Sequence, residues 1–280
     1  MRSHPSHAKL GRRRFLAGLA MGAAAATSPA FGAGKGLIGT AINHLSYQSA
    51  DYRKTRDFYR DVLGFQVSDE DDQQLYLWAG NTLISAKNTP LVRSPWIDHW
   101  GVTVEPWDLN TIEAVLKERS LPARISRNDP HDPSGKSAFT RDPNGYTLQL
   151  CAKDLEAKPA PAATRAPLRA IGLHHVAYQC PDYKKPRDFY RELVGAAVSN
   201  DDGQQAHLVL GDAFLVVRTN PDSTAARPIE HIAWTLADWN VKRVAVELKR
   251  HGLDVRPDAA GKSIFSKDVN GYPLVLCDRN

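Results

Sequence analysis

The sequence predicts an α+β protein made of four modules, each with the order strand–helix–strand–strand–strand (βαβββ). Three observations support this prediction. The chain contains an internal duplication, each copy divides again into two similar halves, and short apolar strands alternate with single amphipathic helices. The four modules therefore fall into two copies of a two-module unit.

The duplication is visible as a constant offset between two segments. Asn43–Gly64 and His174–Gly195 align at an offset of 131 residues, with 12 of 22 positions identical. Further matches lie near the end of each copy: Gly135–Phe139 with Gly261–Phe265, and Asp142–Tyr146 with Asp268–Tyr272. The pattern predicts two homologous domains, 38–152 and 171–280, joined by a Pro- and Ala-rich linker at 153–170.

The elements of the first copy follow the module pattern in order. We expect a strand at Ile42–Gln48 and then a helix at Tyr52–Leu63, because its apolar residues recur at helical spacing and Gly64 follows as a stop signal. The turn Asp142–Gly145 is a hairpin signal before the last strand. The other expected elements are strands at 74–78, 82–86 and 99–104, a helix at 109–119, and strands at 138–140 and 146–151. One strand of the later modules has no clear signal.

The N-terminal segment 1–33 has the features of an export signal. It holds five basic residues and no acidic residue, and Arg12–Leu16 fits the twin-arginine pattern. The apolar stretch that follows is rich in Ala and Gly and too short for a membrane span. We therefore expect export to the periplasm by the twin-arginine route, with no stable membrane span after signal removal. A retained anchor or a disordered tail is the alternative.

Charge and cysteine content limit the other classes of function. The net charge is +5, and without the five basic residues of the N-terminal segment 31 basic residues face 31 acidic ones. A neutral chain gives no electrostatic reason to expect a nucleic-acid partner. Three cysteines, Cys151, Cys180 and Cys277, are too few and odd in number for a disulfide framework, and one bridge remains open. No phosphate-binding loop, nucleophile elbow or CxxC pair occurs.

The modules, a histidine in each opening strand, and the turns DPNGYTLQL and DVNGYPLVL together resemble the vicinal oxygen chelate superfamily. That group includes glyoxalases, bleomycin resistance proteins, fosfomycin-resistance enzymes and extradiol dioxygenases. The resemblance covers nearly all of the chain after residue 37. It implies that two modules pair into one cup-shaped half-barrel, so that the chain forms two cups with a metal on the cup floor. One such fold hosts several chemistries, and the resemblance does not fix the reaction.

Two histidine pairs fall at the positions that the resemblance implies for metal ligands. His44 and His99 open the modules of the first copy, and His175 and His231 open those of the second. Neutral imidazole suits Fe, Mn, Zn or Ni, so we expect a divalent metal ion as cofactor.

The third ligand departs from the family pattern, which places a Glu on the final strand. Here that position is Gln149 in the first copy and Val275 in the second. Gln149 can offer an amide oxygen and Val275 offers nothing. We therefore expect the first cup, with His44, His99 and Gln149, to be the better metal site.

Other residues are candidates for the same face or its rim. Because alternate strand residues share a face, substrate contacts are expected from Ser46, Gln48, Thr103 and Cys151. Tyr76 and His207 occupy matching strand positions and are candidate proton-transfer groups, although each is equally compatible with a rim position. Arg141 and Lys267 could attract an anion, and solvated loop charges are the alternative.

Three hypotheses about function remain open. The first is an exported metalloenzyme acting on a small vicinal-oxygen or aromatic compound, extradiol dioxygenase-like rather than glyoxalase-like, because strand 82–86 lacks the extra carboxylate that a glyoxalase-like lyase or isomerase needs. The second is a metal-free protein that binds and sequesters a small molecule, as bleomycin resistance proteins do. The third is a structural or partner-binding role. Both cups can form within one chain, so the protein is expected as a monomer or a homodimer.

Overall fold

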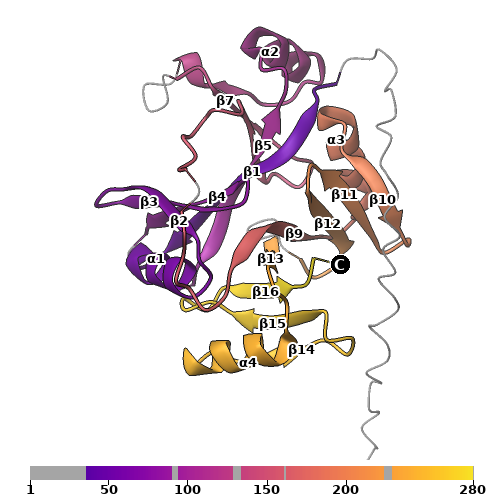
Figure 1. The fold of residues 1–280 in the computed structure, drawn as a ribbon. Coiled ribbons are helices and arrows are strands. Elements are labelled where there is room, and N and C mark those ends of the chain that lie inside the picture. The colour runs from indigo at the N-terminus through magenta and orange to yellow at the C-terminus, as the bar shows by residue number, and fades with distance from the viewer. Residues whose placement is uncertain (1–35, 90–93, 129–133, 161, 224–228, 280) are drawn as a thin grey trace, which may run out of the picture. The chain divides into compact units, whose positions relative to one another are not determined.

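Two eight-stranded mixed sheets, one from each copy, form the described part of the protein (Figure 1). The structure is a computed structural model that describes residues 36–89, 94–128, 134–160, 162–223 and 229–279. The segment 1–33, to which the export signal was assigned, lies outside these residues. No helix within the described ranges is long and apolar enough to cross a membrane.

The first sheet has the strand order β2-β3-β4-β1-β5-β8-β7-β6 and carries two helices. Its strands are β1 (Gly39–Ser49), β2 (Gln66–Glu70), β3 (Gln74–Ala79), β4 (Thr82–Asn88), β5 (Trp96–Val104), β6 (Arg124–Ile125), β7 (Ser137–Arg141) and β8 (Thr147–Cys151). Its helices are α1 (Tyr52–Asp61) and α2 (Leu109–Glu118), and a short 3-10 turn, η1 (Ser126–Asn128), follows β6.

The second sheet repeats this topology as β10-β11-β12-β9-β13-β16-β15-β14. Its strands are β9 (Ala170–Cys180), β10 (Ala197–Asp201), β11 (Gln205–Leu210), β12 (Ala213–Thr219), β13 (Ile229–Leu236), β14 (Arg256–Pro257), β15 (Ser263–Lys267) and β16 (Pro273–Cys277). Its helices are α3 (Lys184–Val194) and α4 (Val241–Arg250).

The predicted fold class is confirmed, because each of the four modules has the order βαβββ. The strand that the sequence did not place is β6 in the first copy and β14 in the second, and each is only two residues long. A strand this short has no alternation of apolar and polar residues by which to be recognised. The prediction also omitted β2, whose residues are half-buried or exposed.

A glycine follows the first helix of each copy, although α1 ends at Asp61, two residues before the predicted end at Leu63. Gly64 and Gly195 both have a positive φ, at 74° and 66°, and Gly195 is the C-cap of α3. A left-handed residue ends a helix, and glycine adopts this conformation without a steric penalty.

The aspartate of each Asn-Gly turn has two roles, of which the sequence showed only one. One carboxylate oxygen of Asp268 accepts hydrogen bonds from the backbone N–H groups of Asn270 and Tyr272, both at 2.9 Å, which shapes the turn. The other oxygen accepts from the Tyr47 and Tyr59 hydroxyls of the first copy, at 2.8 and 3.4 Å. The turn therefore links the two copies.

The same arrangement occurs in the opposite direction. Asp142 of the first copy accepts from the hydroxyls of Tyr178 and Tyr190 in the second copy, at 2.6 and 3.2 Å. Burial raises the pKa of both aspartates, because water no longer solvates the charged form. The copies thus share a buried polar contact as well as apolar packing.

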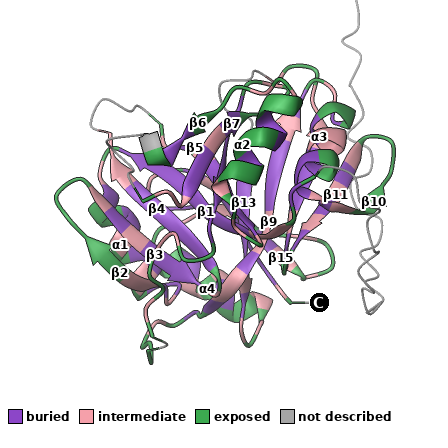
Figure 2. Cartoon of the chain, turned by 90° about the horizontal axis from the view of Figure 1, so that it is seen from above, coloured by how far each residue is buried: buried purple, intermediate pink, exposed green. Residues whose placement is uncertain are grey.

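The strands carry most of the buried residues, and the helices are largely exposed on the side seen in Figure 2. Trp100 and Trp234 are fully buried, and each ring packs edge-to-face against an aromatic ring of the other copy, Tyr190 and Phe65 respectively. Cys151, Cys180 and Cys277 are buried free thiols, so none of them forms the disulfide that the sequence left open.

Candidate functional site

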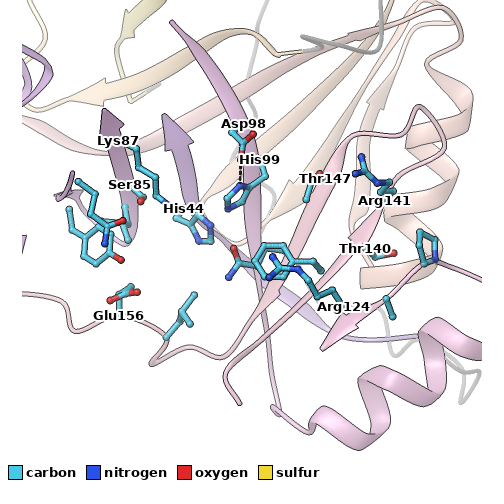
Figure 3. A pocket seen from close by; sticks show the side chains of 18 residues that line it. His44, Ser85, Lys87, Asp98, His99, Arg124, Thr140, Arg141, Thr147 and Glu156 are labelled. Carbon is cyan, nitrogen blue, oxygen red and sulfur yellow. Dashed lines mark hydrogen bonds and ion pairs between the residues drawn. The ribbon is translucent and has the colours of Figure 1, made fainter. Parts of the chain in front are cut away.

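A cavity of about 790 Å³ opens on the first sheet, and His44, His99 and Gln149 line it (Figure 3). The three residues come from β1, β5 and β8, which lie side by side in the sheet. His44 pairs with Gly101 of β5, and Gly101 pairs with Gln149 of β8, so His44 and Gln149 flank a glycine in one row. We call this face of the first sheet the first cup. The structure therefore brings the three predicted ligands together at one cavity.

The environment of His44 fixes the form of its ring. The side chain is 5% exposed, and its Nδ1 lies 2.9 Å from Oδ1 of Asn43. Because an amide oxygen only accepts, Nδ1 carries the proton and Nε2 keeps its lone pair. Burial, with the nearby His99 and Lys87, lowers the pKa of His44 to about 3. His44 is thus neutral at pH 7, which is the form that binds a metal ion.

His99 is oriented by the residue that precedes it. Its Nδ1 lies 2.8 Å from a carboxylate oxygen of Asp98, and this contact lowers the pKa of Asp98 (Figure 3). A carboxylate behind a histidine fixes the tautomer and directs the other nitrogen outward. His99 therefore presents Nε2, as His44 does.

The spacing of the two rings fits a shared ion. Their centroids lie 5.3 Å apart with the planes at 89°. With metal–nitrogen distances of about 2.1 Å, two imidazoles on one ion have centroids roughly 4.5–5.5 Å apart. Within the described ranges no three His, Cys, Asp or Glu side chains form a group that could hold a metal ion, so a third donor would have to be a neutral side chain. The amide oxygen of Gln149 is the third donor that this cup offers.

Gly101 makes room for the His44 ring. A Cβ atom at this position would lie 2.5 Å from both Cε1 and Nδ1 of His44 and 3.0 Å from the sulfur of Cys151. Real Cβ atoms do not approach other atoms so closely, so the observed ring position requires glycine. The second copy has Ala233 at the corresponding place opposite His175.

The remaining sequence candidates divide into two groups. Tyr76 lines the cavity with Glu156, and burial together with this carboxylate raises the pKa of Tyr76 to about 12. The residues predicted to contact substrate do not line the cavity: Ser46, Gln48, Thr103 and Cys151.

Those four residues instead contact one another or the neighbours of His44. Gln48 donates to Ser46 at 3.2 Å, Thr103 accepts from Asn43 at 3.0 Å, and the sulfur of Cys151 lies 3.9 Å from Nδ1 of His44. His44 and Ser46 still share a face of β1, because the register with β5 is continuous from His44 to Ser46 and Ser46 pairs with His99.

Several cavity residues were missed by the sequence analysis. Lys87 and Ser85 come from β4, Arg124 comes from the two-residue strand β6, and Phe139 comes from β7. The guanidinium of Arg124 lies 3.9 Å from the centroid of the Phe139 ring. Residues two apart on a strand share a face, so Arg141, which was a candidate, indicated Phe139 two residues earlier on β7. Arg124 had no such signal, because β6 has no pattern.

The second copy holds its histidines differently. Nε2 of His175 lies 2.9 Å from Nε2 of His231, and Nδ1 of His175 lies 2.7 Å from Nδ1 of His174. Both ring nitrogens of His175 thus contact another imidazole, and burial holds its pKa well below the usual value. His207 lies close enough to lower the pKa of His175 further.

The floor beside these histidines is apolar, since Ala233, Val275 and Cys277 form a separate buried cluster. The second cup therefore lacks a third donor at the position of Gln149.

Comparison with known proteins bears on the family and the fold. Residues 41–150 match the family described as the Glyoxalase/Bleomycin resistance protein/Dioxygenase superfamily. This match covers the first copy, and the first copy is similar to this superfamily. The match agrees with the resemblance seen in the sequence, and the second copy shares the topology of the first.

Solved structures show the same fold over most of the chain. The Mn(II)-bound glyoxalase from Novosphingobium aromaticivorans has a TM-score of 0.70 at 16% identity, covering 87% of this chain and 83% of that one. The 2,3-dioxygenase LapB from Pseudomonas sp. KL28 has a TM-score of 0.67 at 18% identity, covering 86% and 93%. In sequence, the metallothiol transferase FosB of Staphylococcus epidermidis is 26% identical over 113 residues, which are 38% of this chain and 81% of the relative. These likenesses show the fold and leave the reaction open.

Proposed function

We propose that the first cup binds one divalent metal ion, Fe, Mn, Zn or Ni, through His44, His99 and Gln149, and acts on a small molecule with adjacent oxygen atoms. The observation that carries this proposal is the pair of imidazoles. Both are fixed at Nδ1 by an adjacent side chain, both present Nε2, and their centroid spacing suits one ion. Relatives of the same fold include a Mn(II)-bound glyoxalase.

A bound ion would polarise the oxygens of a chelated ligand. The chain's own residues then have distinct tasks. Asn43 and Asp98 hold the histidine tautomers. The row of paired residues from His44 to Gln149 sets the side from which a ligand approaches the ion. Tyr76, with its pKa raised to about 12, keeps its proton at neutral pH and can donate a hydrogen bond within the cavity.

An extradiol dioxygenase-like reaction is the version that we favour. On β4 the cavity is lined by Leu83, Ser85 and Lys87 and by no carboxylate, whereas a glyoxalase-like site needs a further carboxylate on this strand. Dioxygenases are also prominent among the solved structures of this fold.

The test is metal binding by the purified full chain. We expect about one equivalent of Mn²⁺ or Zn²⁺ in a calorimetric titration, loss of binding in His99→Ala, and retention in the matched control His231→Ala. Gln149→Glu should raise the affinity clearly, because a carboxylate offsets the charge of the ion. If the native protein holds no Fe, Mn, Zn or Ni and neither ion binds, the enzyme proposal is wrong and a metal-free sequestering protein takes its place.

We also propose that the protein is exported by the twin-arginine route, on the basis of the motif at Arg12–Leu16. Fractionation of cells that make the full chain should recover it outside the cytoplasm. Replacing Arg12 and Arg13 by Lys should retain it in the cytoplasm. Equal fractionation of the two forms would contradict this route.

A further inference from the structure

We infer that Trp100, Tyr190 and Asp142 form a redox route that carries an oxidising equivalent away from the first cup and into the contact between the two copies. The inference rests on the proposed function, because a reaction with dioxygen at a metal ion supplies the one-electron oxidant. Imidazole rings beside such an oxidant are themselves open to oxidation. The route would therefore protect His44 and His99.

The route begins with Trp100, directly beneath the cup. His99 and Trp100 are consecutive residues of β5, and consecutive strand residues point to opposite faces of a sheet. His99 lines the cavity, whereas Trp100 is fully buried on the other side of the same strand. The indole ring is among the most easily oxidised side chains, so Trp100 is the first residue able to fill an electron vacancy at the cup.

Tyr190 of the second copy continues the route. Its ring contacts that of Trp100, with centroids 5.1 Å apart and planes at 62°. The Tyr190 hydroxyl donates to Oδ2 of Asp142 at 3.2 Å, and the Tyr178 hydroxyl donates to the same oxygen at 2.6 Å. These distances fall within the roughly 2.6–3.2 Å over which a base takes up a proton.

The carboxylate is what makes these phenols oxidisable. A tyrosine loses an electron readily only when its proton leaves at the same time, and it therefore needs a base in hydrogen-bond contact. Burial raises the pKa of Asp142, so its carboxylate accepts a proton more readily than an exposed aspartate does. Asp142 is thus placed to receive the proton of either tyrosine.

The transfer balances in charge and atoms. One electron passes from Trp100 to the dioxygen-derived oxidant, which leaves an indole radical cation. One electron of Tyr190 then refills Trp100, while the phenolic proton moves to Oδ2 of Asp142. The products are neutral Trp100, a neutral phenoxyl radical at Tyr190 and a protonated Asp142. Tyr178 can exchange with Tyr190, because Asp142 returns one proton and takes up the other.

The second copy repeats the end of this route and lacks its beginning. Ile232 takes the place of Trp100, since it follows His231 and pairs with Val176 of β9 as Trp100 pairs with Leu45 of β1. An aliphatic side chain does not carry an electron vacancy. The hydroxyl contacts recur there as Tyr47 and Tyr59 on Asp268. The oxidisable residue therefore lies only under the cup that has a third candidate ligand.

Trp234 provides a matched control. It is as fully buried as Trp100, but its ring contacts Phe65, with centroids 4.8 Å apart. Phe65 lies between Trp234 and Tyr59, with centroids 5.0 Å from the latter, and a phenyl ring is not oxidised under these conditions. Trp234→Phe and Trp100→Phe thus remove the same atoms from equally buried positions and differ in whether a tyrosine is in contact.

The first experiment needs no metal ion. The full chain is frozen with hexaamminecobalt(III) as electron acceptor and illuminated with ultraviolet light that excites tryptophan and not tyrosine. Electron paramagnetic resonance then measures the yield of tyrosyl radical. We expect Trp100→Phe, Tyr190→Phe and Asp142→Asn to lose most of the signal and Trp234→Phe to keep it. Equal yields in Trp100→Phe and Trp234→Phe would overturn the route.

The second experiment links the route to the cup. The Fe²⁺-loaded full chain is exposed to dioxygen with ascorbate, and mass spectrometry follows oxidation of His44 and His99. We expect faster oxidation in Trp100→Phe than in the natural protein or in Trp234→Phe, and Trp100→Tyr should restore protection because its ring is oxidisable.

The outcomes separate this inference from the proposed function. If Fe²⁺ binds and Trp100→Phe shows no faster oxidation of the histidines, the protective route is wrong and the metal site stands. If Fe²⁺ does not bind while illumination gives the expected pattern, the metal site is wrong and the redox route stands. Thermal unfolding shows whether each variant is folded, and Tyr190→Phe serves if Trp100→Phe is not.

Discussion

Replacing Gly101 by alanine should move the His44 ring without changing any proposed ligand. The new Cβ would lie 2.5 Å from two atoms of the ring. The ring cannot move away freely, because His44 is 5% exposed and hydrogen-bonded to Asn43. To restore an ordinary contact of about 3.5 Å the ring must shift by roughly 1 Å.

A displacement of this size is large for a metal ligand, whose distances are held within about 0.2 Å. Changes behind a ligand typically cost 10- to 100-fold in metal affinity, and we expect a loss of at least this size in Gly101→Ala. Overpacking should also lower the free energy of unfolding, by about 1–3 kcal/mol.

The assay is a Zn²⁺ titration together with thermal unfolding, and Gly172→Ala is the matched control. Gly172 lies in β9, and a Cβ there would meet no atom within 4 Å. The reasoning is refuted if Gly101→Ala binds Zn²⁺ as tightly as the natural protein. It is also refuted if Gly172→Ala loses affinity to the same extent.

Three further predictions concern other parts of the molecule. Asp98→Asn should weaken metal binding about tenfold or more, because the carboxylate no longer orients His99; unchanged affinity would exclude this role. Burial raises the pKa of Asp142 and Asp268 above the ordinary value of 3.8, so the folded state holds their protons more tightly than the unfolded state does. The stability that this contributes is complete below about pH 3.8 and is lost as the pH rises through the raised pKa values. The double variant with Asn at both positions should flatten that part of the stability–pH curve in urea unfolding, and an unaltered slope would contradict the assignment. Tyr47→Phe should lower the free energy of unfolding by about 1–3 kcal/mol, because Asp268 loses a buried donor, and Tyr52→Phe is a control outside this contact.

The sequence predicted the fold well because its signals are repeated. Each copy has its own glycine after the first helix, Gly64 or Gly195, and its own Asn-Gly turn. A signal that recurs at matching positions in both copies is not a chance pattern. The second role of Asp142 and Asp268 was not predictable, because it depends on how one copy packs against the other. No pattern within a single copy carries that information.

The candidate site was predicted only in part, and the reason lies in the strands. His44, His99 and Gln149 were found because they occupy matching positions at the starts and ends of modules. Arg124 was missed because a two-residue strand has no periodicity. Ser46 and Gln48 were expected as substrate contacts because they share a face with His44, but their side chains bond to each other and to Thr89 instead of lining the cavity, which alternation alone does not predict.

The two cups differ in the residues that contact each histidine ring and in the residues of the sheet next to it. In the first cup Asn43 accepts a hydrogen bond from Nδ1 of His44, and Gly101 leaves space for the ring, which lines the cavity. In the second cup a histidine replaces Asn43 and an alanine replaces Gly101, and His175 is occupied at both nitrogens by other imidazoles. A duplicated fold therefore need not duplicate its site. The two histidine pairs have similar spacing, with ring centroids 5.3 Å apart in the first cup and 5.0 Å in the second, so the cups differ in the groups around the rings and in the third donor, which Val275 does not supply.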